Sequence, residues 1–278
     1  MKERELNFTD KHFQRIRAFI TKQTGIVINE SKVDMVYGRL SRHVRQKHGG
    51  SFDAFCDAFE SNTDNHQEIL INAITTNLTA FFREKHHFSY LQQQVFPYLL
   101  KANKVNQKIR IWSAGCSTGE EPYSIAMTIM QAIPDWRNWD IRILATDLDS
   151  NVVETGRAGV YSQERLSGVD ESMVRRFFFK GKGEQAGLVS VRPELKELVT
   201  FKRLNLLHEW PMRGSFDVIF CRNVVIYFDK ETQRKLFQRY ADILAPQGHL
   251  FIGHSESLHN ISDAFDNLGQ TIYRKLPI

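Results

Sequence analysis

The sequence predicts an α/β protein: an all-helical N-terminal domain, then a mostly parallel sheet with helices on both faces and a small antiparallel insert. Three observations support this. Residues 1–76 carry only helical patterns, and strand and helix patterns alternate after about residue 88. Residues of about 174–204 break the alternation with two β-rich runs joined through glycines and charges. Alternation of this kind is typical of parallel sheets covered by helices.

Composition narrows the class of protein. The 278 residues are 42% hydrophobic and 25% charged, which is ordinary for a globular chain, and no apolar run is long enough to span a bilayer. The charged N-terminus lacks the apolar core of a secretory signal, and three scattered cysteines outside any CxxC spacing disfavour disulfides and zinc. We therefore expect a cytoplasmic protein. The net charge of +5 indicates an acidic partner without distinguishing nucleic acid, membrane or protein.

Helical signals fill the N-terminal domain. One helix is expected from a possible N-cap at Asp10 to a stop at Gly25, and a second from Ser31 to Gly49, with shorter helices at 51–61 and 66–77. The second helix has an apolar stripe of valines and a leucine at helical spacing. Its basic residues lie elsewhere on the helix and form a basic face: Lys32, Arg39, Arg42 and Arg45.

Strands and helices then alternate along the α/β domain, residues 88–278. The expected strands are Lys108–Ser113, Ile141–Thr146, Phe216–Cys221 and His249–Gly253. The expected helices are Pro122–Ala132, Ser150–Gly156 and Lys230–Leu244.

A glycine loop follows the first of these strands. Gly115 and Gly119 lie where a doubly wound sheet binds its cofactor, because glycine lets the backbone approach a ligand closely. A phosphate-binding loop would continue with Lys-Ser/Thr, whereas Glu120 and Glu121 follow here. The GxGxxG dinucleotide pattern is also absent. Carboxylates suit a ligand with positive charge and hydroxyl donors, as in S-adenosylmethionine, while Glu120 is expected only to favour the helix N-terminus.

Polar residues also end the next strands. Asp147 is placed to accept hydrogen bonds from ribose hydroxyls, whereas Asp149 is expected to cap the following helix. Arg222 and Asn223 end a third strand, and Tyr227 and Phe228 behind them fit either a site or the core. That segment lacks the motifs of DNA base methylases, and Ser257 breaks the esterase pattern GxSxG.

Five motifs together resemble those of the chemotaxis receptor glutamate O-methyltransferases: TTNLTAFFRE, WSAGCSTGEEPYSIAM, ATDLD, FCRNVVIYFD and GHSE. They occur in the family's order and extend over nearly the whole chain. The resemblance implies a Rossmann-like class I S-adenosylmethionine-dependent methyltransferase core. It also implies methyl transfer to glutamate side chains on the cytoplasmic helices of chemoreceptors, with S-adenosylhomocysteine as the second product.

The resemblance also implies which residues form the site. Residues 77–87 become a linker that contributes to it. The implied cofactor-binding residues are Asn77, Thr79, Arg83, Glu121, Asp147, Asn205, Leu206, Arg222 and Asn223. Arg83 and Tyr227 are implied to lie nearest the transferred methyl group, so they are the catalytic candidates.

A glutamate with a pKa of about 4.3 is already ionised at neutral pH, so methyl transfer to it needs no general base. We expect Arg83 to orient the acceptor carboxylate or the cofactor, and Tyr227 to lie beside the methyl group. No metal is expected, because His86 and His87 are adjacent and should point apart on a helix, and HExxH is absent.

Partners follow from charge and from the resemblance. Arg39, Arg42 and Arg45 are expected to dock acidic receptor helices, although a solvated basic face is a common alternative. The insert resembles a β-subdomain that in some members binds a C-terminal receptor pentapeptide, and Gly181-Lys182-Gly183 matches the loop concerned. An ordinary hairpin turn is the alternative there. We expect a monomer that neither binds nucleic acid nor inserts into membranes.

Two other functions fit parts of the sequence. One is a non-catalytic S-adenosylmethionine-binding signalling module, which only a turnover measurement separates from an enzyme. The other is a nucleic-acid methyltransferase, which the basic charge supports but the missing base-methylation motifs oppose.

Overall fold

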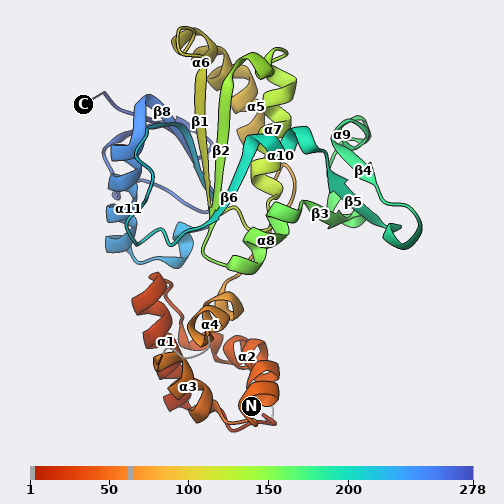
Figure 1. The fold of residues 1–278 in the computed structure, drawn as a ribbon. Coiled ribbons are helices and arrows are strands. Elements are labelled where there is room, and N and C mark those ends of the chain that lie inside the picture. The colour runs from red at the N-terminus through yellow and green to blue at the C-terminus, as the bar shows by residue number, and fades with distance from the viewer. Residues whose placement is uncertain (1–3, 62–64, 278) are drawn as a thin grey trace.

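The structure, a computed structural model, describes residues 4–61 and 65–277. A helical domain at the N-terminal end lies against one end of a larger α/β domain (Figure 1). The helices are α1 Asp10–Thr24, α2 Val33–Lys47, α3 Phe52–Glu60, α4 His66–Ile74, α5 Lys85–Tyr90, α6 Phe96–Ala102, α7 Glu120–Ala132, α8 Ser150–Ala158, α9 Glu171–Phe177, α10 Pro193–Leu198 and α11 Lys230–Ile243. In the described part of the chain, no helix is both long and apolar enough to cross a membrane.

The N-terminal domain packs four helices, α1 to α4, around one apolar core. Thr9, rather than the expected Asp10, is the N-cap of α1, because its hydroxyl accepts from the backbone N–H of His12 while the His12 side chain accepts from Thr9. Gly25 ends α1 in the left-handed conformation, as expected. The predicted stripe of α2 is confirmed by the full burial of Val36, Leu40 and Val44.

In residues 4–61 and 65–277, ten strands form two sheets. The main sheet has the order β6-β2-β1-β7-β8-β10-β9, parallel from β6 to β8 and antiparallel through β10 and β9. The strands are β1 Lys108–Ala114, β2 Asp140–Asp147, β3 Val160–Ser162, β4 Phe178–Lys180, β5 Leu188–Val191, β6 Val199–Arg203, β7 Phe216–Cys221, β8 Leu244–Ile252, β9 Phe265–Gly269 and β10 Ile272–Lys275.

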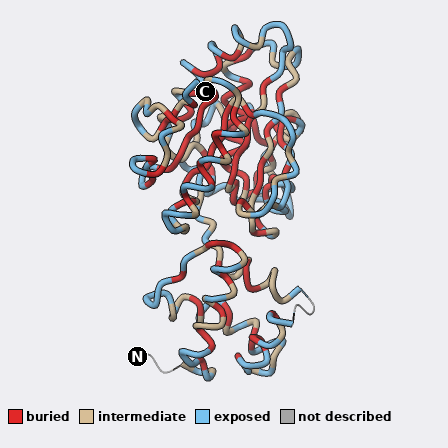
Figure 2. Tube along the Cα trace, turned by 90° about the vertical axis from the view of Figure 1, so that its left-hand side faces the viewer, coloured by how far each residue is buried: buried red, intermediate tan, exposed pale blue. Residues whose placement is uncertain are grey.

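Both faces of the main sheet are covered. On β7, Val218 and Phe220 join a core shared with α5, α6, α7 and α10, whereas Ile219 and Cys221 join the core under α11. Strands buried on both faces need a continuous apolar run rather than alternation, which the sequence of β7 provides. Figure 2 shows the buried residues concentrated in these central strands and in the interior of the helical domain.

The antiparallel insert is present, but its bounds differ in part from those expected. Its sheet has the order β3-β5-β4 and projects to one side of the molecule (Figure 1), and it begins at β3, ahead of residue 174. β4 and β5, the two β-rich runs joined through glycines and charges, pair antiparallel as expected. β6, which also lies within the expected bounds of the insert, instead extends the main sheet parallel to β2. Val199 and Phe201 alternate with exposed residues in β6, and such a pattern reveals a strand without revealing which sheet it joins.

The C-terminal hairpin of β9 and β10 was not predicted. Polar residues dominate β9 and the turn that follows it, so the segment lacks the apolar run of a central strand. The hairpin extends the main sheet beyond β8. It does not contribute residues to the ends of the strands that line the pocket.

Candidate functional site

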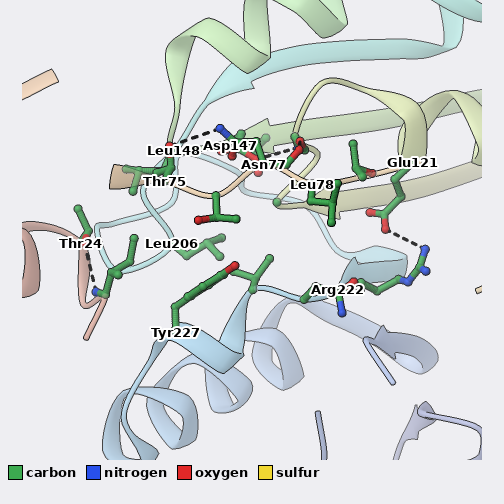
Figure 3. A pocket seen from close by; sticks show the side chains of 18 of the residues that line it. Thr24, Thr75, Asn77, Leu78, Glu121, Asp147, Leu148, Leu206, Arg222 and Tyr227 are labelled. Atoms are coloured by element: carbon green, nitrogen blue, oxygen red, sulfur yellow. Dashed lines mark hydrogen bonds and ion pairs between the residues drawn. The ribbon is translucent and has the colours of Figure 1, made fainter. Parts of the chain in front are cut away.

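A pocket opens where the parallel strands end, facing the helical domain. It has a volume of about 1060 Å³ including the part open to solvent, which is adequate for a nucleotide-sized ligand. Its wall combines the ends of β1, β2, β6 and β7 with the chain that follows α1 and α4 (Figure 3).

The structure brings the predicted site residues together in this pocket. Lining residues include all nine cofactor candidates and Tyr227: Asn77, Thr79, Arg83, Glu121, Asp147, Asn205, Leu206, Arg222, Asn223 and Tyr227. They come from five separated segments, so the fold alone makes them neighbours. Arg39, Arg42 and Arg45 lie on α2, outside the pocket.

Backbone geometry and close packing explain why glycines occupy two positions of the glycine loop. Gly115 and Gly119 have φ of +112° and +97°, in the region that favours glycine. A Cβ on Gly115 would lie 2.3 Å from a methyl of Val224, and one on Gly119 would lie 2.8 Å from the Cα of Gly156. The two glycines therefore allow close packing around the pocket, a role in addition to the predicted approach of backbone to ligand.

Asp147 lies at the end of β2 and binds the glycine loop. One carboxylate oxygen accepts from the backbone N–H of Ser117 at 2.8 Å, and the other accepts from that of Asp149 at 3.0 Å. Burial raises the pKa of Asp147 to about 6, against the opposing effect of these backbone bonds. Each oxygen retains lone-pair capacity toward the pocket, so Asp147 can also accept from ligand hydroxyls.

Glu121 is paired with Arg222 at the other end of the pocket (Figure 3). Arg222 Nη1 lies 3.1 Å from one Glu121 oxygen, and the Ser113 hydroxyl donates to the other at 2.7 Å. Burial raises the pKa of Glu121, while Arg222 and Ser113 oppose the shift.

Glu84 also pairs with this arginine, at 3.4 Å. Burial acts to raise the pKa of Glu84, but Arg222 and His254 outweigh it and the pKa is lowered. One guanidinium thus lies between two buried carboxylates, which favours a cationic group nearby.

Glu256 was missed as a functional residue, although it belongs to the GHSE motif. Its carboxylate accepts backbone N–H bonds from Gly253 and from four successive residues, 223 to 226, at 2.6 to 3.3 Å. Burial nevertheless raises its pKa. Glu256 therefore fixes the chain that carries Asn223 and leads to Tyr227, and an acid just after a strand-ending glycine was the available signal.

The chain at Thr75 to Asn77, where α4 leads into the linker, is hydrogen-bonded to the start of α8. Asp149 caps α8 as predicted, accepting from the backbone N–H of Asn151. Its second oxygen accepts at 2.7 Å from both Thr75 and Asn77. The Asn77 carbonyl in turn accepts from the Ser117 hydroxyl, so the linker bonds directly to the glycine loop.

Two predicted binding residues use their side chains within the protein. The Asn205 amide donates to the carbonyl of Gln23 at 2.7 Å and so connects the end of α1 to the α/β domain. Arg39 donates to the carbonyls of residues 73 to 75 and thereby caps the C-terminus of α4. Arg45 pairs with Glu5, which leaves Arg42 as the one of the three candidates whose side chain has neither a hydrogen bond nor an ion pair to the described residues.

Arg83 and Tyr227 retain free polar groups in the pocket. Arg83 donates to the Leu78 carbonyl at 2.9 Å, its one side-chain hydrogen bond to the described residues. Tyr227 points its hydroxyl into the pocket (Figure 3), while its backbone carbonyl accepts from Val27 of the helical domain at 2.9 Å. Both side chains can therefore contact a bound substrate.

The expectation that His86 and His87 point apart is wrong. Their rings lie 4.2 Å apart, and both contact the carbonyl of Gln270, because they occupy the first turn after the left-handed Glu84.

Glu120 was expected only to favour the start of a helix through its charge, but its carboxylate also makes specific contacts. It is fully buried, accepts from the Thr118 hydroxyl at 2.6 Å and lies 3.4 Å from Arg165.

The wall fits S-adenosylmethionine chemically. Asp147 and Glu121 offer acceptors for hydroxyl and ammonium groups, and apolar side chains lie between them, including Leu206 and Tyr227. When bound, this cofactor would supply an electrophilic methyl group on a sulfonium. Asp147, Glu121 and Asn77 are the residues that would hold it.

Comparison with known proteins agrees with this chemistry. Residues 77–274 match the family described as CheR methyltransferase, SAM binding domain, and residues 11–75 match CheR methyltransferase, all-alpha domain. The chain is 43% identical to chemotaxis protein methyltransferase 2 of Pseudomonas aeruginosa, covering 97% of this chain and 94% of that protein. It is 42% identical to the chemotaxis protein methyltransferase of Escherichia coli, covering 96% and 92%.

Proposed function

The chain belongs to the CheR methyltransferase family, and on this premise we propose that it methylates glutamate side chains of chemoreceptor cytoplasmic helices. S-adenosylmethionine-dependent methylation in chemotaxis is the activity shared with its relatives. The products would be glutamate methyl esters and S-adenosylhomocysteine.

The observation that carries the proposal is the convergence of Arg83 and Tyr227 on the pocket that Glu121 and Asp147 also line. The residues that would bind the cofactor and the candidate catalytic residues thus line one cavity, which is also open to the methyl acceptor. Cysteine is an unsuitable nucleophile here, because Cys116 and Cys221 are buried and burial raises the pKa of both thiols.

The reaction balances without a proton transfer. A carboxylate oxygen of the acceptor bonds to the methyl carbon while the carbon–sulfur bond breaks and its electron pair remains on sulfur. The anion and the sulfonium become a neutral ester and a neutral thioether. This chain then needs only to orient the acceptor and exclude water, and such alignment can supply about 7–11 kcal/mol of the barrier.

Arg83 and Tyr227 are the residues assigned to that alignment. The Arg83 guanidinium has donors left over from Leu78, and a planar pair of them suits a carboxylate. Tyr227 would hold its ring and hydroxyl beside the reacting carbon, on a backbone that Glu256 and Val27 fix in place.

The test measures methyl transfer to a chemoreceptor cytoplasmic fragment by the full chain and three variants. Arg83→Ala and Tyr227→Phe should lower kcat at least about tenfold, with Kd for S-adenosylhomocysteine changed less for Tyr227→Phe. Tyr98→Phe, on exposed α6, is the matched control and should match the wild type. Wild-type turnover and cofactor affinity in both variants would refute the roles. Cofactor binding without turnover by the wild type, on several receptors, would favour the non-catalytic module.

A further inference from the structure

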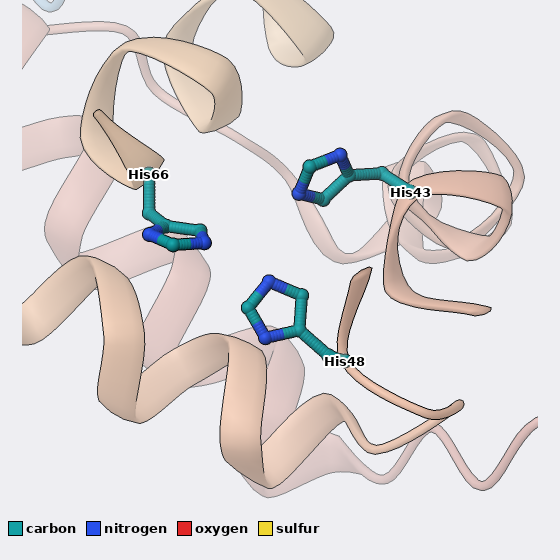
Figure 4. A group of neighbouring side chains, drawn as sticks. All are labelled: His43, His48 and His66. Atoms are coloured by element: carbon teal, nitrogen blue, oxygen red, sulfur yellow. The ribbon is translucent and has the colours of Figure 1, made fainter. Parts of the chain in front are cut away.

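Three histidines meet in the helical domain, outside the set of residues that line the pocket. His43 lies on α2, His48 directly follows α2, and His66 begins α4. Figure 4 shows their rings turned toward a common centre. Ring centroids are 4.8 Å apart for His48 and His66, 5.5 Å for His43 and His48, and 6.2 Å for His43 and His66.

Two ring nitrogens in this group lack partners. The Nε2 atoms of His43 and His48 are buried and have no hydrogen bond to any described residue. Buried polar atoms in native proteins nearly always have a partner, so two adjacent orphans indicate a missing ligand. Burial also lowers the pKa of both histidines, with smaller contributions from His66 and, for His43, from Lys47. They are therefore neutral near pH 7, the form that coordinates metals.

The surroundings hold the rings in place. Phe55 of α3 is fully buried and contacts all three histidines edge-on, with centroid distances of 5.3 to 6.4 Å. An apolar wall on one side leaves the nitrogens of the rings facing one another. One ligand atom from each histidine lies within 4.8 Å of the others, against about 3.4 Å between ligands of a tetrahedral zinc ion. A bound ion would require side-chain rotations that bring the three nitrogens closer together.

We propose that His43, His48 and His66 form a binding site for a divalent transition metal of the zinc class. Three imidazoles suit Zn²⁺, Co²⁺, Ni²⁺ and Cu²⁺, and a three-histidine site leaves a fourth position for water. The sequence did not predict this site, because the third histidine lies eighteen positions beyond the second and no compact metal motif joins them.

The metal would tie two helices that already meet where Arg39, near the middle of α2, contacts the end of α4. Arg39 of α2 caps the C-terminus of α4, whereas His43 and His48 lie near the end of α2 and His66 at the start of α4. A metal at the histidines would thus fix α4 at both ends. The linker at Thr75 to Asn77 follows α4 directly and forms the pocket wall.

A second group of possible ligands, Glu84, His86 and His87, is less suitable. Arg222 lies 3.4 Å from Glu84, so a cation already occupies that neighbourhood. His87 is fully buried and contacts the Gln270 carbonyl and the Thr271 hydroxyl. This group serves as the internal comparison for the test.

The test titrates the full, untagged, chelator-treated chain with Co²⁺ and Zn²⁺. We expect saturable binding of one ion per chain, with the visible spectrum of tetrahedral Co²⁺ and its displacement by Zn²⁺. His43→Gln and His48→Gln should each weaken binding at least about tenfold, and Zn²⁺ should raise the melting temperature of the wild type but not of these variants. His259→Gln, at an exposed site, and His86→Gln should bind as the wild type does.

NMR of the histidine side chains in the wild-type protein is a second test, and it does not depend on whether a variant folds. Zn²⁺ should shift the ring signals of the three histidines and leave those of His86 and His87 in place. The proposal is overturned by absence of saturable binding, by wild-type affinity in His43→Gln and His48→Gln, or by shifts confined to His86 and His87.

Discussion

Asp147 shows how burial and hydrogen bonding adjust one carboxylate for binding. Its oxygens already hold the glycine loop through Ser117 and receive the backbone N–H of Asp149. Burial, aided by the negative charge of Asp149, still raises its pKa to about 6. Keeping Asp147 ionised at neutral pH therefore costs the free protein desolvation free energy. A ligand that donates hydrogen bonds to the carboxylate offsets part of this cost.

The pKa of Asp147 predicts a pH-dependent affinity. Because ribose hydroxyls favour the ionised form, Kd for S-adenosylhomocysteine should rise as pH falls through about 6, at most about tenfold per pH unit. Calorimetric titrations between pH 5 and 8 measure this. Folding raises this pKa from 3.8 to about 6, so ionisation of Asp147 lowers the stability of the free protein as pH rises between these two values. Protonation of Asp147 at low pH therefore does not destabilise the fold, and weaker binding there would not result from acid unfolding at this group.

Asp147→Asn is the control for that titration. It should bind more weakly at pH 7 and show little dependence on pH, since an amide does not titrate. A wild-type Kd that stays constant from pH 5 to 8, or an unchanged slope in the asparagine variant, would exclude Asp147 as the group responsible.

At the scale of elements, the glycine loop joins β1 to α7 through residues that have no room for side chains. Gly119 has a positive φ and packs against the Cα of Gly156 and the hydroxyl of Tyr161. The helix that follows begins with Glu120 and Glu121, whose carboxylates make the bonds to Thr118 and Arg222. The loop therefore fixes the direction of both carboxylates.

Gly119→Ala should destabilise the protein by at least about 2 kcal/mol. The left-handed backbone costs an alanine about 1–2 kcal/mol, and the contact with Gly156 adds overpacking. The melting temperature should fall by at least about 4 °C in calorimetric scans.

Gly214→Ala is the matched control, because nothing lies within 4 Å of its added Cβ. Its melting temperature should stay within about 2 °C of the wild type. Equal melting temperatures for both variants would show that the loop does not depend on glycine at position 119.

The elements that the sequence predicted are those with strong local patterns. The buried strands β1, β2 and β7 and the helices α1 and α11 lie close to their expected bounds, because apolar runs and caps mark them. Register and partner choice are not local. The assignment of β6 to the main sheet and the pairing of β3 with β5 depend on contacts across the chain, and β9 carries too few apolar residues to be recognised.

The same distinction applies to the site. The family resemblance implied ten site residues, and all ten line one pocket. Most of them follow the end of a strand or lie in the linker. The motifs did not predict Glu84 as the second partner of Arg222, nor the end of α4 as the place where Arg39 binds. Such contacts join residues that lie far apart in sequence and close together only in the fold.

At the scale of the whole molecule, charge and domain arrangement bear on the proposed docking of a receptor helix. The helical domain closes one side of the pocket through Thr24, Ile26 and the linker, and α2 lies beyond it on the same domain. With a net charge of +5, the chain should attract an acidic receptor helix before contact. The proposed methylation would turn the acceptor into a neutral ester and so remove part of that attraction.

Salt should separate receptor docking from cofactor binding. Raising ionic strength from 0.01 to about 0.3 M should increase KM for a receptor fragment several-fold, because exposed charges are screened, while Kd for S-adenosylhomocysteine changes little. Arg42→Gln should raise KM at low salt and reduce this dependence. Arg137→Gln, just before β2 and so at the opposite end of the parallel strands from the pocket, should behave as the wild type.

The reverse pattern would contradict docking by charge. If salt weakened cofactor binding and left receptor KM unchanged, or if Arg42→Gln and Arg137→Gln acted alike, α2 would not be the docking face. Arg39→Gln is unsuitable for this comparison, because its guanidinium caps α4 and the variant would also lose stability.

The most direct test of the account is the chemical identity of the product. The chain is incubated with methyl-labelled S-adenosylmethionine and a chemoreceptor cytoplasmic fragment, and the labelled fragment is then treated with mild alkali. If glutamate is the acceptor, label should enter the receptor fragment during the incubation. It should then leave as volatile methanol in alkali, since carboxyl methyl esters hydrolyse under these conditions. Label that stays on the receptor through alkali would indicate methylation of nitrogen and would contradict the proposed glutamate acceptor.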